Sequence, residues 1–494
     1  MSNQGSITAK AKSVFFSRPT ISIPIAATLV SCLTACLIGN TEQFGHVPYY
    51  YMQFLPVRAL REEFLLSIYN LHSQLPLENI LFGLIVNLFR GSTNHPEYAN
   101  DFWRGDSYWI GVALKQAIFV WLILYSSFRV YHTYLNKRAA IFLTFFIALL
   151  PSTMMFFLFP YSALMCASIY AYLACNVLTE AKTPKRLLIT ATCIMLLGLS
   201  HNLFSYYTTF PLLIVFGLEL IRYRKKLSNL VALALALILL LPISWMAKNF
   251  IAFGITNLTS WSGCALNQSM SPHMTGIKDA SGKEITGFHG WKEAHARIQI
   301  PADYDPDLKI PTPLALNQRM KGEGVRNWNH KSVIASCKSS KEESLRHLLS
   351  LKRVRDGFLN ATFNRLWDTS GKLGSEFTCP GCGFGYDFLG FGRVGRVVNA
   401  LNAAGVKQWP VRLWTAFALV VSPIIGAIRF SRVMKDSTSS KRLYMASFMM
   451  VNIFVVLMAV SLSTIENERM LWMLMPASNI ILGPVFSKRL RTQA

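Results

Sequence analysis

The chain has 494 residues, of which 52% are hydrophobic and 15% are charged. A soluble globular protein carries about 25% charged residues, so the composition excludes an ordinary soluble domain and predicts an all-α polytopic membrane protein. The formal net charge of +24 would suggest a nucleic-acid partner in a soluble chain. Here the basic residues gather between apolar segments, so we expect membrane lipids and no nucleic acid as partners.

Runs of roughly 17 to 25 apolar residues, the length that crosses a bilayer, predict about ten transmembrane helices. They lie near residues 22–40, 109–130, 139–158, 160–178, 186–204, 207–221, 228–247, 411–429, 442–463 and 468–486. Two longer segments, 41–108 and 248–410, separate them. The predicted units are a bundle over 1–247 that includes the first outer loop 41–108, a mixed loop domain over 248–410, and the C-terminal helices over 411–494.

Basic residues occupy every second connection between the predicted spans. They are Lys10, Lys12 and Arg18; Arg129, Lys137 and Arg138; Lys182, Lys185 and Arg186; Arg222, Arg224, Lys225 and Lys226; Arg429, Arg432, Lys435, Lys441 and Arg442; and Lys488, Arg489 and Arg491. The positive-inside rule therefore predicts that both termini are cytoplasmic and that both long segments are extracytoplasmic. We expect the first apolar stretch to be a retained anchor. The lack of a retention signal favours a bacterial inner membrane.

The first outer loop is expected to contain two helices that lie in the membrane interface. The stretch "PVRALREEFLLSIYNL", 56–71, has an apolar and a charged face, and the apolar part of 71–89 begins after Pro76 and is too short to span comfortably. We expect His72, between them, to position the loop. Glu42 is the first carboxylate after the first span. Its position alone favours a residue that caps or solvates a helix end, and partial desolvation there would also suit a general base. Glu62 and Glu63 are the alternatives.

Three further polar residues follow at the outer ends of spans. His201 and Asn202, in "GLSHNLFSYY", could contact a substrate or make a structural hydrogen bond. Lys248, which opens "KNFIAFGITNLTSWSGCALNQ", could bind a phosphate or place its ammonium group at the membrane surface.

The large loop contains four of the nine cysteines, namely Cys264, Cys337, Cys379 and Cys382. An even number in an oxidising compartment favours disulfides. The "CPGC" at 379–382 leaves two alternatives open, half of a four-thiolate zinc site or a redox pair.

The last predicted span opens with "TIENERMLWML", 464–474. Glu466, Glu468 and Arg469 stand together at its outer edge. Arg469 could bind an anion, pair with one of the two carboxylates, or do both.

Three stretches together resemble the GT-C superfamily of integral membrane glycosyltransferases, which transfer sugars from polyprenyl-phosphate carriers outside the cytoplasm. "LHSQLPLENILFG" is similar to the first-loop pattern of a histidine followed by a Pro-Leu pair that opens a juxtamembrane helix. The segment after Lys248 and the stretch "ENERMLWMLMP" resemble two further motifs of that superfamily.

The resemblance implies a hexosyl- or pentosyltransferase that uses a lipid-linked sugar donor and a glycan, lipid or protein acceptor. It also implies inversion by a single displacement, for which one carboxylate base suffices. Glu42 would be the base, and Lys248 and Arg469 would bind the phosphate, with Glu466 or Glu468 orienting Arg469. No cofactor or metal ligand set is indicated, although the chemistry would accommodate a divalent ion.

Two other classes remain as alternatives, a polytopic transporter or lipid flippase and a non-catalytic relative that scaffolds a cell-envelope complex. A transporter is expected to bury ionisable residues near mid-bilayer and often to contain repeated halves. The predicted spans are almost free of charge at their centres, and the two halves of the chain look unlike.

Overall fold

A computed structural model describes the parts of the chain from which the fold and the site are built. These are residues 19–50, 54–89, 107–180, 183–201, 204, 206–223, 228–262, 313–316, 329, 333–334, 337–338, 341, 417–433, 439–462 and 472–486. Over these residues the chain is helical and contains no strand, as the sequence predicts. The helices before the large loop are α2 (Pro19–Ile38), α3 (Gln43–Tyr50), α4 (Val57–Glu62), α5 (Phe64–Tyr69), α6 (Pro76–Leu88), α7 (Tyr108–Tyr134), α8 (Lys137–Ala148), α9 (Pro151–Leu158), α10 (Ser162–Thr179), α11 (Pro184–Ser200), α12 (Tyr206–Tyr223) and α13 (Asn229–Phe253). After a short turn at η5 (Leu314–Leu316), the C-terminal part contains η8 (Phe417–Val421), α21 (Ser422–Val433), α22 (Ser439–Leu462) and α24 (Met475–Phe486).

The structure confirms the membrane character of the chain. Within the described residues, four helices are long and apolar enough to cross a bilayer: α2, α7, α10 and the Val231–Phe253 part of α13. The pair formed by α8 and Ser152–Leu158, bent by 51°, would make a fifth if it is one broken span. Helices occupy most of the described part of each of the ten predicted segments, with 139–158 divided between α8 and α9, and the count of ten spans stays a prediction.

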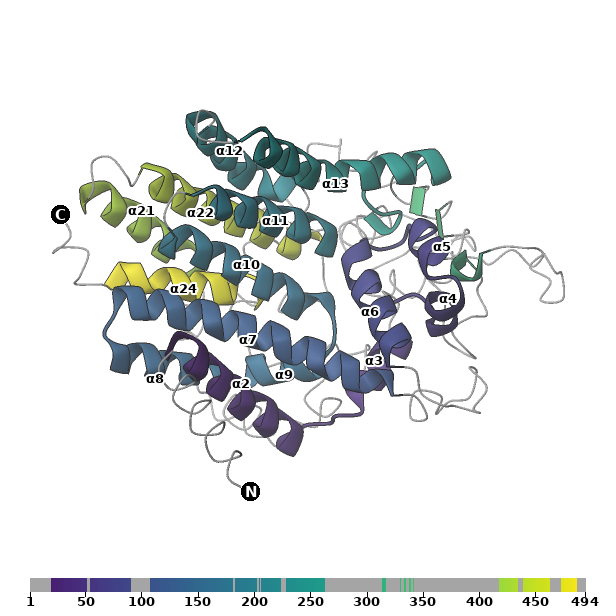
Figure 1. Ribbon diagram of the computed structural model, residues 1–494, viewed down its shortest axis with the longest axis horizontal. Helices are drawn as coiled ribbons and strands as arrows, with labels where there is room; N and C mark the ends of the chain where they lie inside the picture. The colour runs from purple at the N-terminus through teal and green to yellow at the C-terminus, as the bar shows by residue number, and fades with distance from the viewer. Residues whose placement is uncertain are drawn as a thin grey trace, which may run out of the picture.

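The helices pack around α10, which is buried along nearly its whole length. Helices α7, α11 and α24 lie against it, α2 and α8 lie on the outer side of α7, and α13 lies on the outer side of α11 (Figure 1). Small residues such as Ala163, Ala167, Ala171 and Ala174 let the neighbouring backbones approach α10 closely, because membrane helices associate through packing rather than hydrophobic transfer.

Helices α3 to α6 gather at one end of this bundle (Figure 1). The predicted helix over 56–71 is divided into α4 and α5, since Glu63 leaves helical geometry with φ −132° and ψ 46°. Helix α6 begins with Pro76 at its first position, where the missing N–H costs nothing. Phe82 of α6 packs edge-on against Phe54 and Tyr108, which fixes α6 to the start of α7. Placement of these helices in the membrane interface stays a prediction.

Helix α13 continues past the predicted end at residue 247 and stops at Phe253. Gly254 ends it with a left-handed φ of 66°, and its N–H bonds to the carbonyls of Asn249 and Phe250. The apolar "FIAF" favours continuation, and glycine is the residue that adopts the left-handed C-cap without strain. Lys248 therefore lies within the last two turns of α13 rather than beyond it.

Replacing Gly254 by alanine is expected to lower the stability of the folded protein by about 1–2 kcal/mol through backbone strain. A Cβ at this position would meet no described atom within 4 Å, so the expected loss comes from the backbone conformation. Gly217→Ala is the matched control, because its Cβ also meets nothing within 4 Å but the residue lies inside α12. Thermal unfolding in detergent should rank Gly254→Ala below the wild type and Gly217→Ala at or above it. Equal melting temperatures for both variants would contradict the assigned cap.

Candidate functional site

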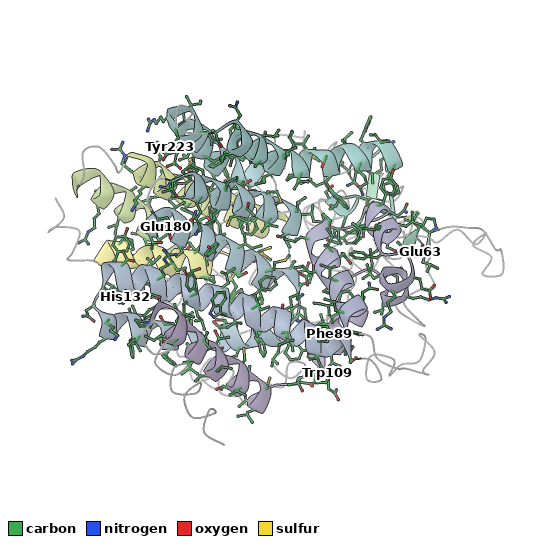
Figure 2. The ribbon with its side chains drawn as sticks, viewed as in Figure 1. Glu63, Phe89, Trp109, His132, Glu180 and Tyr223 are labelled. Atoms are coloured by element: carbon green, nitrogen blue, oxygen red, sulfur yellow. The ribbon has the colours of Figure 1, made fainter. Side chains whose placement is uncertain are left out.

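The two ends of the bundle differ in character. Glu63 lies at the end that carries α4 and α5, whereas His132, Glu180 and Tyr223 lie at the opposite end (Figure 2). Lys137 and Arg138, which follow α7, and Arg222, near the end of α12, belong to the opposite end. Under the predicted orientation, the end with α3 to α6 is extracytoplasmic.

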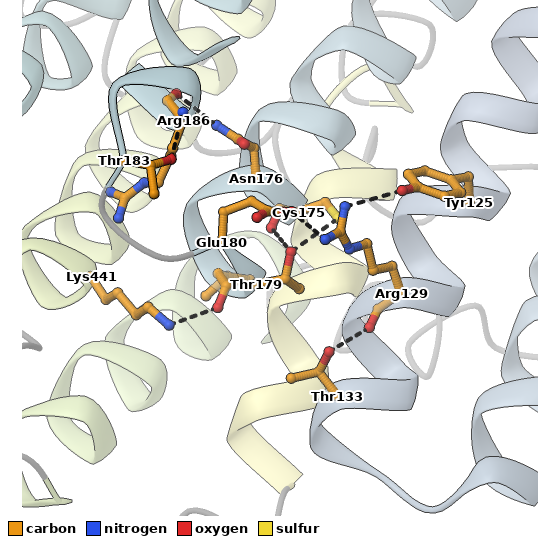
Figure 3. Close-up of polar contacts among 11 residues, drawn as sticks. Tyr125, Arg129, Thr133, Cys175, Asn176, Thr179, Glu180, Thr183, Arg186 and Lys441 are labelled. Atoms are coloured by element: carbon orange, nitrogen blue, oxygen red, sulfur yellow. Dashed lines mark hydrogen bonds and ion pairs between the residues drawn. The ribbon is translucent and has the colours of Figure 1, made fainter. Parts of the chain in front are cut away.

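Polar contacts at the opposite end serve to join helices. Arg129 of α7 pairs with Glu180 after α10 and donates to the hydroxyl of Tyr125 at 3.0 Å (Figure 3). Lys441 of α22 donates to the carbonyl of Leu178 at 2.8 Å. The polar groups at this end are therefore structural, and the candidate site lies at the outer end.

His72 joins the first outer loop to the residues that follow α13. It is fully buried, and its Nε2 lies 2.8 Å from the carbonyl oxygen of Asn329, which can only accept, so Nε2 carries the proton. Nδ1 then accepts from the hydroxyl of Ser260 at 2.9 Å, and the N–H of Ser260 bonds to the carbonyl of His72 at 2.8 Å. With both ring nitrogens engaged, His72 acts as a positioning residue in this structure.

Asn329, which no sequence motif indicated, completes the same connection. Its Oδ1 accepts the backbone N–H of His72 at 2.8 Å, while its Nδ2 donates to the carbonyls of Asn70 and Ala315 at 3.0 and 3.1 Å. One buried amide side chain thus holds the first outer loop against η5.

Lys248 lies beside this connection. Its Nζ donates to the carbonyls of Tyr69 and Leu71 at 3.1 and 2.6 Å and lies 3.7 Å from the ring centre of Trp245. A lysine ammonium has three N–H donors, so these two bonds leave a third for another acceptor. The structure therefore places a lysine side chain at the junction of α13 and the first outer loop.

A polar pocket of about 30 Å³ opens at the outer ends of α6, α10 and α11. It is lined by Gln74, Leu75, Glu78, Asn79, Tyr161, Ser162, Ser200 and His201. This volume holds about two water-sized groups. His201, named from the sequence as a candidate for such a cavity, lies in its wall, whereas Asn202 is outside the described residues.

Glu78 is the charged residue of this pocket, and sequence reasoning missed it. It is 4% exposed, and its Oε1 pairs with Lys115 of α7, itself 8% exposed. Its other oxygen, Oε2, is buried and has no hydrogen-bond partner in the described part of the chain. A signal existed in the sequence, because single opposite charges inside the apolar segments 76–88 and 109–130 require partners.

The three carboxylates named as candidate bases lie elsewhere in the first outer loop. Glu42 is exposed in the turn before α3, where its N–H bonds to Oδ1 of Asn40 at 3.0 Å. Glu62 is exposed and pairs with Arg58 at 2.7 Å. Glu63 accepts the N–H of Leu314 at 2.9 Å and so holds η5. None of the three lines the pocket at Glu78.

The remaining candidates fall largely outside the described residues. These are Glu466, Glu468, Arg469, Cys264, Cys379 and Cys382. Cys337 is buried and disulfide-bonded. Where the chain is described, no group of three or more His, Cys, Asp and Glu residues could hold a metal ion.

No protein-family model and no curated protein matches the chain. Solved structures that resemble it include ArnT from Cupriavidus metallidurans bound to undecaprenyl phosphate, with 10% identity, a TM-score of 0.32, and coverage of 90% of this chain and 78% of ArnT. The archaeal oligosaccharyltransferase AglB from Archaeoglobus fulgidus, in complex with an inhibitory peptide and a dolichol-phosphate, has 12% identity and a TM-score of 0.31. Coverage is 95% of this chain but only 50% of AglB. TM-scores below 0.5 at these identities assign neither a family to the chain nor a role to any residue.

Proposed function

We propose that the chain is an integral membrane glycosyltransferase that moves a sugar from a polyprenyl-phosphate carrier to an extracytoplasmic acceptor. The observation that carries the proposal is the arrangement of polar groups at the outer end of the bundle. There Lys248 fastens the first outer loop to the end of α13, and His72 bonds to Ser260 and Asn329, which follow that helix in the chain. Two residues after His72, Gln74 lines the polar pocket at the span ends. Such an arrangement puts polar groups where a lipid-linked phosphate and its sugar would meet.

In the proposed reaction, an acceptor hydroxyl attacks the anomeric carbon, the bond from that carbon to the phosphate oxygen breaks, and the polyprenyl phosphate leaves. Glu42 takes the acceptor proton as general base, and inversion follows from the single displacement. Lys248 and Arg469 stabilise the charge that develops on the leaving phosphate, and Glu466 or Glu468 orients Arg469.

The lipid would approach along α13. Most of this helix is exposed, including Leu237, Ile243 and Phe250, and it leads directly to Lys248. An apolar helix face that ends in a cation suits a polyprenyl chain that ends in a phosphate. The candidate carriers to assay are the polyprenyl phosphates that are bound to ArnT and AglB.

The proposal is tested with the full chain reconstituted in liposomes. A panel of radiolabelled polyprenyl-phosphate hexoses and pentoses is supplied from the extracytoplasmic side together with cell-envelope lipids, glycans and proteins as acceptors. We expect at least one donor to be consumed, with polyprenyl phosphate as a product and label in an acceptor. A folded protein that neither binds nor consumes any donor would overturn the proposal.

Replacing Lys248 by glutamine is expected to weaken binding of polyprenyl phosphate by about 10- to 100-fold, because a hydrogen bond between charged groups contributes about 1.5–3 kcal/mol. Lys248 also anchors the carbonyls of Tyr69 and Leu71, so the control ligand is the matching polyprenol, which lacks the phosphate. Affinity for the polyprenol should not change. An equal loss for both lipids would mean that Lys248 acts only on the structure of the loop.

A further inference from the structure

The pocket is lined by Glu78, which carries a buried hydrogen-bond acceptor that nothing in the described part of the chain satisfies. Oε1 of Glu78 accepts from Lys115, while Oε2 is buried without a partner. An unsatisfied buried carboxylate oxygen is costly, and the residue that carries it lines a pocket, so a hydrogen-bond donor that enters this pocket would offset that cost.

The neighbouring polar groups narrow the chemistry of that donor. Ser200 donates its hydroxyl hydrogen to the carbonyl of Leu196, which leaves its oxygen lone pairs for another donor. Lys115 already neutralises Glu78, so the pocket offers no net negative charge to a cation. A hydroxyl group, which is neutral and both donates and accepts, fits this set better than an ammonium group or a metal ion.

The size and the lining of the pocket also favour a hydroxyl group as the ligand. About 30 Å³ accommodates one or two hydroxyl groups but not a sugar ring. Tyr161 and His201, whose rings meet edge to face with centres 6.4 Å apart, form an aromatic wall beside it. A ligand would therefore insert a hydroxyl edge and leave its ring at the mouth.

We propose that this pocket is a subsite for the hydroxyl groups of a sugar, with Oε2 of Glu78 as the acceptor that recognises them. The inference rests on the proposed glycosyltransferase function. The sugar can come from the lipid-linked donor or from a glycan acceptor, since both present the same hydroxyl chemistry.

The variant Glu78→Gln is informative because Lys115 can only donate. Lys115 keeps the amide oxygen in the place of Oε1 and turns the amide NH₂ group toward the pocket, so an acceptor becomes a donor. The double variant Glu78→Leu with Lys115→Met removes both buried charges at similar volume, a change that proteins often tolerate. Glu180→Gln, which breaks an ion pair at the opposite end of the bundle, is the matched control.

The experiment measures binding to the full chain in nanodiscs in two arms. In the first, the affinities for a polyprenyl-phosphate sugar and for the same polyprenyl phosphate without sugar are compared. In the second, methyl glycosides of the same sugars are titrated with and without bound polyprenyl phosphate. We expect the wild type and Glu180→Gln to gain affinity from the sugar, and both Glu78 variants to lose at least about tenfold of that gain while binding the bare lipid normally.

The two arms separate the sources of the sugar. A Glu78-dependent loss confined to the first arm assigns the subsite to the donor, and one confined to the second assigns it to the acceptor. If the sugar contributes no affinity in the wild type, or if folded Glu78 variants retain the gain in both arms, the inference is overturned and the pocket binds water. A wild type that binds no polyprenyl phosphate but binds methyl glycosides through Glu78 would overturn the proposed function and keep the subsite.

Discussion

Replacing Glu42 by glutamine is expected to lower the turnover number of sugar transfer by about 10²- to 10⁴-fold, the usual contribution of a general base. Glutamine has nearly the same size as glutamate but cannot take a proton from the acceptor hydroxyl at neutral pH. Glu42 is exposed in the turn before α3, so we expect the substitution to leave the fold intact. Affinity for the lipid-linked donor should stay close to that of the wild type.

The measurement is the single-turnover rate with the donor identified in the liposome assay. Glu62→Gln and Glu63→Gln are parallel variants that test the two alternative bases. The first breaks a surface pair with Arg58, and the second weakens the attachment of η5 through Leu314. A large loss of rate in one of these variants, together with normal turnover in Glu42→Gln, would move the base to that residue. Normal turnover in all three would exclude a carboxylate of this loop segment as the base.

The helical architecture was largely accessible from the sequence, because apolar runs of spanning length leave few alternatives for the backbone in a membrane. Local signals also predicted helix ends where the cause is local, as at Pro76, which opens α6. The predicted end of α13 at residue 247 was wrong by about one and a half turns, because the helix continues to Phe253 and Gly254 ends it. The division between α4 and α5 was missed because Glu63 has no breaker chemistry of its own. Its side chain is instead engaged by the N–H of Leu314, far away in the chain.

The candidate site was less accessible because its contacts join distant segments. Asn329 lies in a polar loop with no motif, yet it bonds to the backbone of His72 and Asn70. Glu78 and Lys115 each looked like a single charge in an apolar segment, and only the packing of α6 on α7 shows that they form a pair. A search for isolated opposite charges in apolar segments would have found both residues but not their partnership.

The same reasoning applies to a second buried pair, which bears on the transporter alternative. Arg186 stands at the start of α11, and Glu219 lies near the end of α12. Both residues therefore lie near the ends of their helices rather than at mid-length, where a transporter is expected to place ionisable groups. Their position favours a structural role at the end of the bundle opposite to the pocket.

Replacing Glu219 by leucine is expected to destabilise the folded protein by about 3–5 kcal/mol, because it leaves a buried guanidinium without its anion. Arg186 is 1% exposed, and its Nη2 donates to both carboxylate oxygens of Glu219 at 2.9 and 3.0 Å. The hydroxyl of Tyr444 donates to the same carboxylate at 3.0 Å, so the loss would also loosen α22. Arginine cannot escape the cost by losing its proton.

The double variant Arg186→Met with Glu219→Leu separates the cost of an unpaired charge from the value of the pair. We expect it to regain most of the lost stability, because replacing a buried ion pair by apolar residues is often neutral. The measurement is thermal unfolding of the full chain in detergent, followed by the fraction of protein that stays monodisperse. The melting temperature of the single variant should lie well below those of the wild type and the double variant. A double variant as unstable as Glu219→Leu would mean that the pair and its bond to Tyr444 stabilise the packing of α11, α12 and α22 directly.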